Sequence, residues 1–297
     1  MNSAGKLINK IKALFVLIIL TLFITPMASA QVALYKVADE DTTLYFMGTI
    51  HLLPQGTNWT TPKIKKAFDS ADTLVVEVSQ SLMTPAATQP LIMKYGFLPQ
   101  GHSLEQYLSA ETYAKVKGIF GANPAAMAQI NRMQPWLVGI TLTMGEFVKA
   151  GFDPNSGVDK MLEKLATEKG KKIQSLESAE FQMKTLANMG KNAKGGMLGD
   201  IIDNLPNAKD EVMRMKDLWL AGDMDGLATM ANKEFKKYPE MLEGLLYARN
   251  RNWMVEIDQM MAMPGTKFIA VGAGHLAGEK SVIDLLKKAG ITVERIQ

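Results

Sequence analysis

The segment LYFMGTIHL at residues 44–52 recurs in outline as FIAVGAGHL at residues 268–276. Each copy has four apolar residues followed by a G-x-x-H-L motif, and the two histidines are His51 and His275. A short apolar run predicts a buried strand, and a glycine directly after it predicts a sharp turn. Glycine makes up only 24 of the 297 residues, so finding two of the three histidines in this context indicates a shared role.

Strands are predicted near both ends of the chain, with helices between them. The strand segments are Val32–Val37, Thr43–Met47, Thr73–Val78, Lys172–Leu176, Lys267–Val271 and Thr292–Ile296. Residues 73–78, TLVVEV, have the β-branched character of a strand buried within a parallel sheet. Residues from about 81 to 263 are mostly helical in pattern. The expected fold is therefore α/β, a three-layer core with a largely parallel or mixed sheet and a long helical insertion between the two G-x-x-H loops.

Residues 1–30 have the pattern of a secretory signal peptide. Three lysines between positions 6 and 12 precede an apolar run of 12 residues at 13–24, and Ala28-Ser29-Ala30 offers a cleavage site. A bilayer span needs about 20 apolar residues, so cleavage after Ala30 is favoured over a retained anchor. We expect residues 31–297 to form a single domain of a secreted or periplasmic protein that has no membrane span.

The charge balance and the lack of cysteine exclude several classes of function. The signal segment carries three lysines and no acid, so residues 31–297 contain 30 basic and 30 acidic residues, without a basic stripe that would indicate nucleic-acid binding. The absence of cysteine excludes thiol catalysis, thiolate zinc sites and iron–sulfur clusters. A bound metal would need His, Asp, Glu or main-chain oxygen ligands. Nothing in the sequence indicates an oligomeric state.

The two G-x-x-H loops are the first candidates for a functional site. In a parallel sheet, ligands bind beyond the carboxyl ends of the strands, and Gly48 and Gly272 would let the chain turn sharply there. We expect His51 and His275 to face one crevice, where imidazole can bind a divalent metal or act as a general base. The alternative is two loop histidines bonded to carbonyls. His102, within the loop sequence PQGHS, has no such context.

Two charged residues interrupt apolar patterns. Glu77 lies in the buried strand at 73–78, where an unpaired carboxylate is costly. It could bind a metal, orient a ligand or accept a proton from metal-bound water, or it could be a strand-end glutamate paired with arginine. Arg249 lies on a helical apolar stripe beside Trp253, so it must find an anion. It either pairs with Glu77 or Glu177, or reaches the crevice and stabilises an oxyanion.

Together these motifs resemble the TraB/GumN family, which includes the animal Tiki proteins. The resemblance covers nearly the whole chain after residue 30. It rests on Gly48–His51, Val75–Val78, Gly157–Asp159, Leu176–Ser178 with Gln182, Arg249–Asn250 with Trp253, and Val271–Glu279. Family members often carry glutamate before the Arg-Asn pair. This chain has Ala248 there, so no catalytic role is expected at that position.

The resemblance implies a fold akin to the erythromycin esterase and ChaN-like group. From the animal members it also implies a peptidase activity that depends on manganese or cobalt rather than zinc. The residues that it carries over to the site are His51, Glu77, Arg249 and His275, with Asp159, Glu177 and Asn250 as supports.

Two hypotheses of function follow. The first is an exported metal-dependent hydrolase acting on a peptide or another apolar small substrate, in which His51 and His275 hold the metal. Glu77 would be the third ligand or the general base, and Arg249 would stabilise the oxyanion. The rival is a non-enzymatic protein that binds a peptide, haem or another apolar ligand in a crevice lined by some of the 21 methionines. The helical spacing of many methionines favours core packing over such a crevice.

Export is testable by identifying the mature N-terminus. Mass spectrometry of the protein recovered from an exporting host should find Gln31, or its cyclised form, as the first residue. Recovery of the chain in the membrane fraction with Met1 retained would show that residues 1–30 are not a cleaved signal peptide.

Overall fold

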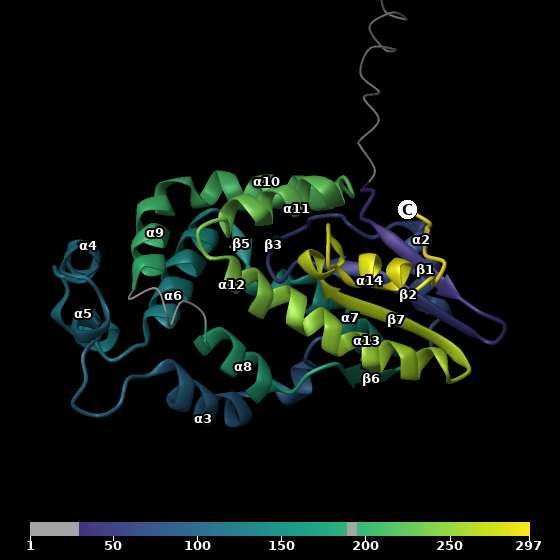
Figure 1. Ribbon diagram of the computed structural model, residues 1–297, viewed down its shortest axis with the longest axis horizontal. Coiled ribbons are helices and arrows are strands. Elements are labelled where there is room, and N and C mark those ends of the chain that lie inside the picture. Colours follow the sequence, from purple (N-terminus) through teal and green to yellow (C-terminus); the bar gives the residue numbers. More distant parts are fainter. Residues whose placement is uncertain (1–29, 189–194) are drawn as a thin grey trace, which may run out of the picture. The chain divides into compact units, whose positions relative to one another are not determined.

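The computed structural model describes residues 30–188 and 195–297, and its sheet and helices belong to the unit formed by residues 31–297 (Figure 1). The predicted signal peptide, apart from Ala30, lies outside the described residues. Within the described part of the chain, no helix has the length and apolar character needed to cross a membrane.

A six-stranded mixed sheet forms the centre of this unit, in the order β6-β4-β7-β2-β1-β8. The strands are β1 (Leu34–Ala38), β2 (Thr42–Thr49), β4 (Thr73–Val76), β6 (Lys172–Ser175), β7 (Gly265–Gly272) and β8 (Glu294–Arg295). The first four in the spatial order run parallel, and β1 and β8 add antiparallel pairings at one edge. The predicted α/β class with a mixed sheet is confirmed, and each predicted strand segment contains a strand.

The sheet is covered on both faces. Phe268, Ile269, Ala270 and Val271 of β7 are each at most 1% exposed, and successive residues of a strand point to opposite faces. The ring of Phe268 meets Phe68 edge to face at 5.5 Å, and Phe68 belongs to α2 (Pro62–Ser70). Helix α7 (Val158–Glu168) packs on β4 and β6, and α13 (Ala248–Met261) contacts β2. The core is therefore layered, as the continuous apolar strands predict.

The long segment between β4 and β7 is mostly helical, as predicted. Its further helices are α3 (Pro85–Gly96), α4 (Ala110–Phe120), α5 (Pro124–Ile130), α6 (Pro135–Lys149), α8 (Ala179–Asn188), α9 (Gly196–Asn204), α10 (Ala208–Leu220), α11 (Met224–Glu234) and α12 (Pro239–Leu242). Helix α14 (Val282–Lys288) follows β7. Two residues of β5 (Phe152–Asp153) interrupt the helices and pair with β3 (Leu53–Pro54). The helices have a small core of their own, formed by Leu98, Leu104, Val116, Ile130, Val138 and Leu198.

One predicted helix is broken in a way that matters for the site. The apolar spacing of residues 239–262 predicts one α-helix, but a π-helix, Glu243–Tyr247, separates α12 from α13. In a π-helix a carbonyl accepts from the N–H five residues ahead instead of four, as the Glu243 carbonyl does from the N–H of Ala248. Directly after this turn, Nη1 of Arg249 donates to the carbonyl of Leu245 at 3.0 Å.

Candidate active site

The candidate site lies where the parallel strands end. Gly48 pairs with Val271 and Thr49 with Gly272, so the two G-x-x-H loops leave the sheet side by side at its carboxyl edge. The approach is close, because a Cβ at Gly48 would lie 2.8 Å from the Cα of Ala273. Neighbouring strands β4 and β6 bring their next residues to the same edge, where the N–H of Glu177 donates to the carbonyl of Glu77 at 2.9 Å.

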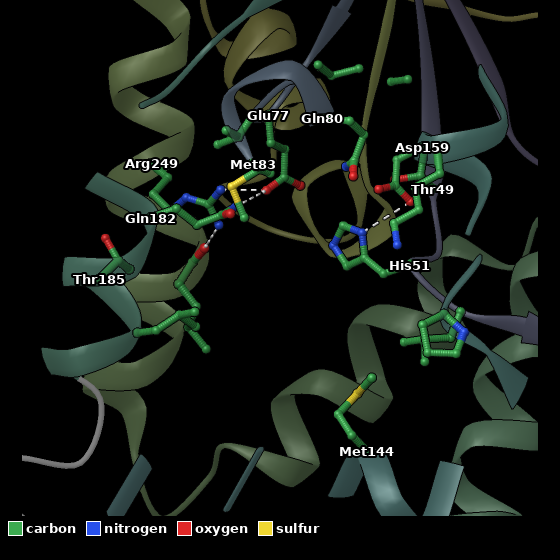
Figure 2. A pocket seen from close by; sticks show the side chains of 18 residues that line it. Thr49, His51, Glu77, Gln80, Met83, Met144, Asp159, Gln182, Thr185 and Arg249 are labelled. Carbon is green, nitrogen blue, oxygen red and sulfur yellow. Dashed lines mark hydrogen bonds and ion pairs between the residues drawn. The ribbon is translucent and has the colours of Figure 1, made fainter. Parts of the chain in front are cut away.

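A cavity of about 550 Å³ opens at this edge (Figure 2). One side carries Glu77 and Arg249, and the other carries His51 and Asp159. The remaining wall is largely apolar and is drawn from both the sheet edge and the helical segment. It includes Leu52, Val76, Val78, Met83, Met144, Pro154, Leu186, Leu245 and Ala270.

Arg249 is the centre of a buried charge network. Its Nη2 donates to Glu77 Oε2 at 2.6 Å and to Glu177 Oε2 at 2.8 Å, and its Nε donates to Glu177 Oε1 at 2.8 Å. The Nε1 of Trp253 also donates to Glu177, at 2.9 Å. The sequence left open which carboxylate Arg249 would meet, and the structure pairs it with both. One guanidinium between two carboxylates leaves an excess negative charge in the network.

All five N–H groups of Arg249 are in use. Besides the three bonds to the carboxylates, Nη1 donates to the Leu245 carbonyl at 3.0 Å and lies 3.1 Å from His275 Nε2. A substrate oxyanion could be bound only if one of these partners were released. Arg249 lines the cavity, but its geometry makes it first a residue that fixes the positions of other groups.

His275 is buried behind this network. It is 3% exposed and is not part of the cavity wall. Its Nδ1 lies 2.6 Å from Oδ1 of Asn250, whose Nδ2 donates to the Lys280 carbonyl at 2.8 Å. Because that amide oxygen can only accept, Nδ1 of His275 carries the proton and Nε2 accepts from Arg249. Burial lowers the pKa of His275 to about 3, so the imidazole is neutral.

Glu77 is ionised and held on both oxygens. Its Oε1 accepts from the N–H of Gly272 at 2.7 Å, and its Oε2 accepts from Arg249 and, at 3.3 Å, from Gln182 Nε2. Burial raises the pKa of Glu77, but the electrostatic effects of the neighbouring His275, Arg249 and His51 and the hydrogen bond from Gly272 outweigh it and set the pKa at about 2. A carboxylate with so low a pKa is a poor general base.

His51 has the opposite environment. Its side chain is 59% exposed, and its Nδ1 lies 3.3 Å from Oδ1 of Asp159. The Asp159 carboxylate raises the pKa of His51 above its ordinary value, against the opposing effect of burial. Figure 2 shows the other ring nitrogen turned toward the cavity. Asp159 stands in the first turn of α7, and the N–H of Val158 before it donates to the carbonyl of Ile50 at 2.9 Å, which ties the helix start to the His51 loop.

The three predicted metal ligands do not form a common donor set in this arrangement. The guanidinium of Arg249 lies between Glu77 and His275, where a metal bound to both would have to be. His51 faces Asp159 on the other side of the cavity. Among the described residues, no group of three or more His, Asp or Glu side chains is placed to hold a metal ion. A metal at His51, His275 and Glu77 therefore stays a prediction, and no chemical step is derived through it.

Two polar residues of the cavity wall were not singled out from the sequence. Thr49 is 3% exposed, and its Oγ1 has no hydrogen-bond partner within the described residues. Gln80 lies just after β4, and Figure 2 shows its side chain pointing into the cavity between Glu77 and Asp159. The position of Thr49 inside the first G-x-x-H motif was the available signal for it. The only signal for Gln80 was a polar residue soon after a buried strand.

The fold and the site define an α/β protein with a buried carboxylate–guanidinium–imidazole network at the carboxyl edge of its parallel strands. The chain belongs to the TraB/PrgY/gumN family, whose family model matches residues 33–295. The resemblance drawn from the sequence motifs is thereby confirmed.

The relatives cover most of the chain at low identity. An uncharacterized protein, YbaP, of Escherichia coli (strain K12) is 26% identical over 250 residues, which are 82% of this chain and 87% of that protein. An uncharacterized protein of Treponema pallidum (strain Nichols) is 23% identical and covers 86% of the chain. A metalloprotease TIKI homolog of Amphimedon queenslandica is 23% identical over 85% of this chain and 59% of its own length. No solved structure matches the chain.

The Arg249 network should dominate stability at the site. Replacing Arg249 with Met removes the cation shared by two buried carboxylates, so we expect a loss of about 3–5 kcal/mol in the free energy of unfolding, measured by urea denaturation. Adding Glu177→Gln should restore part of it. The matched control is Arg251→Met, which breaks the exposed pair with Glu243 and should cost at most about 1 kcal/mol. Equal free energies of unfolding for Arg249→Met and Arg251→Met would show that the buried network stabilises the fold no more than the exposed pair does.

The neutral state of His275 should appear as a pH dependence of stability. Its pKa is lower in the folded chain than in the unfolded chain, so the unfolded chain takes up the proton first and stability falls as the pH drops from 6.5 toward about 3. Between pH 7 and pH 4.5 this should cost about 3 kcal/mol. The lowered pKa of Glu77 adds its loss only below its ordinary value of 4.5, down to about 2.

The measurement is the free energy of unfolding at several pH values in the parent and in His275→Gln. The variant should have a shallower slope between pH 7 and pH 4.5, whereas His102→Gln, outside the network, should keep the slope of the parent. Parallel curves for the parent and His275→Gln would mean that the pKa of His275 is the same in the folded and the unfolded chain.

Proposed function

We propose that the chain is a hydrolase that cleaves peptide bonds in the cavity at the carboxyl edge of the sheet. The observation that supports it is the His51–Asp159 pair, an exposed imidazole on the cavity wall held against a carboxylate and facing Glu77 across the cavity. A base oriented by a third group is the arrangement that hydrolytic sites use to activate a nucleophile. Membership of a family with a metalloprotease relative is consistent with this class of reaction.

The chemistry assigned to the pair is proton transfer. With its Nδ1 directed at Asp159, His51 presents Nε2 as the acceptor for a proton of water. The resulting hydroxide attacks the substrate carbonyl, and the proton passes from His51 to the leaving amine nitrogen when the carbon–nitrogen bond breaks. The Asp159 carboxylate raises the pKa of His51 above its ordinary value, which makes the imidazole a stronger base. Arg249 and Glu77 hold the opposite wall in place and keep its charge fixed.

Dependence on manganese or cobalt and export remain predictions. The name of the TIKI homolog states a metalloprotease activity for that protein, whereas in this chain the proposed proton transfer needs no metal. The assay therefore includes both conditions, with EDTA and with added manganese or cobalt. Export depends on residues 1–30 and is tested separately.

The experiment is a screen of the purified chain against an internally quenched peptide library. We expect cleavage by the parent, and a loss of about 100-fold or more in His51→Gln and in Asp159→Asn, because each removes part of the general base. His102→Gln is the matched control and should cleave like the parent. Undiminished cleavage by His51→Gln would contradict the proposal. Peptides that bind to the parent without being cleaved would favour the non-enzymatic binding protein.

A further inference from the structure

The donors of Arg249, Gly272 and Gln182 at the cavity are already occupied. Each N–H of Arg249 is used within the protein, and the N–H of Gly272 is taken by Glu77. The Nε2 of Gln182 also donates to Glu77, at 3.3 Å. Hydrolysis of an amide builds negative charge on the carbonyl oxygen, and preorganised hydrogen-bond donors supply much of the rate at such sites. The proposed reaction therefore needs a donor other than these.

Gln80 offers a donor at the position between Glu77 and the His51 ring (Figure 2). No described residue hydrogen-bonds its side-chain amide, and that amide points into the cavity between Glu77 and Asp159, close to the His51 ring (Figure 2). A glutamine amide presents donors and an acceptor, the complement of the N–H and carbonyl that one residue of an extended peptide directs to the same side. On the same wall, the Oγ1 of Thr49 is buried and unpartnered within the described part of the chain. Buried hydroxyls without a partner are rare, so this one also favours a polar ligand.

The backbone of Gln80 is fixed from beneath. Its N–H donates to both carboxylate oxygens of Glu163, at 2.9 and 3.1 Å, and the hydroxyl of Ser79 donates to the same carboxylate at 2.9 Å. The N–H of Ser79 donates in turn to Oγ of Ser175, at the end of β6. Glu163 is only 6% exposed on α7. A carboxylate is costly to bury unless its oxygens are hydrogen-bonded, and those of Glu163 bind the Gln80 N–H and the Ser79 hydroxyl. Glu163 therefore holds the backbone of Gln80 in one position.

We infer that Gln80 binds the extended backbone of the substrate, with its amide NH₂ donating to the carbonyl oxygen of the bond to be cleaved and its Oε1 accepting from the N–H of the residue that carries this carbonyl, and that Glu163 is its positioning residue. The inference rests on the proposed function and narrows it, because a site that pairs the N–H and the carbonyl of one residue selects substrates with an amide N–H on the acyl side of the cleaved bond. A substrate lacking the N–H leaves the glutamine oxygen without its donor.

The first test is kinetic. In Gln80→Met the side chain keeps its length and loses its polar atoms, so we expect kcat/KM on the best library peptide to fall about 100-fold, with an unchanged melting temperature because no bond within the described protein is lost. Gln89→Met, at an exposed position of α3, is the matched control and should equal the parent. Parent-like kcat/KM in Gln80→Met would overturn the inference.

The positioning role is tested by a double-mutant cycle. Glu163→Gln keeps the size of the side chain and weakens its hydrogen bonds to the Gln80 N–H. It should lower kcat/KM by about tenfold, and this whole loss should come from the displacement of Gln80. Adding Glu163→Gln to Gln80→Met should then cost little more. Full additivity of the two losses would show that Glu163 acts on the fold and not through Gln80.

A binding measurement separates this inference from the proposed function. In a nitrogen-15 NMR titration with N-acetyl-leucine amide, the side-chain amide signal that is absent from Gln80→Met should shift, whether or not the parent cleaves peptides. The depsipeptide analogue O-acetyl-leucic acid amide, in which an ester oxygen replaces the leucine N–H, should shift it less. If no cleavage is found and the signal still shifts, the hydrolase proposal fails and amide binding by Gln80 stands. An unmoved signal at saturating ligand overturns the inference.

Discussion

The buried guanidinium of Arg249 is the constraint on which the arrangement of the site depends. It lies between Glu77 after β4, Glu177 after β6 and His275 after β7, and it reaches back to its own helix at the Leu245 carbonyl. Three loops that would otherwise be held only by their strands are thus joined to one side chain of α13. A buried charge is stable only with its partners complete, so any change that removes one partner affects all of the others.

Much of this framework could be predicted from the sequence because its signals are local. Apolar runs such as TLVVEV identify strands, and parallel strands bring their following residues to one edge of the sheet. Glu77 and Arg249 stand out because a charge within an apolar pattern needs a partner of opposite sign. The pairing of Arg249 with a carboxylate follows from that requirement. The choice between one partner and two depends on the register of β4 against β6, which no local pattern contains.

The features that sequence reasoning missed are those set by long-range geometry. The apolar spacing of residues 239–262 is compatible with an unbroken α-helix and gives no signal of the π-helix before Arg249. Gln80 has no motif, and its backbone N–H is bound by Glu163, 83 residues further along the chain. The metal expected from the resemblance needs a set of free ligands, and the sequence does not reveal that Arg249 engages two of them.

The two G-x-x-H motifs show that a local sequence pattern predicts the position of a residue and not its chemistry. Both place a histidine at the end of adjacent parallel strands, so their backbone role is the same. Their chemistry differs because each meets a different second residue. His275 is enclosed by Trp253, whose ring centre lies 4.2 Å away, and its two nitrogens are taken by Asn250 and Arg249, which leaves it neutral and structural. His51 meets a carboxylate and the open cavity, so it keeps a nitrogen free for reaction. The repeated motif thus brings two imidazoles to the sheet edge. Arg249 occupies a nitrogen of His275, whereas Asp159 leaves a nitrogen of His51 free to act as a base.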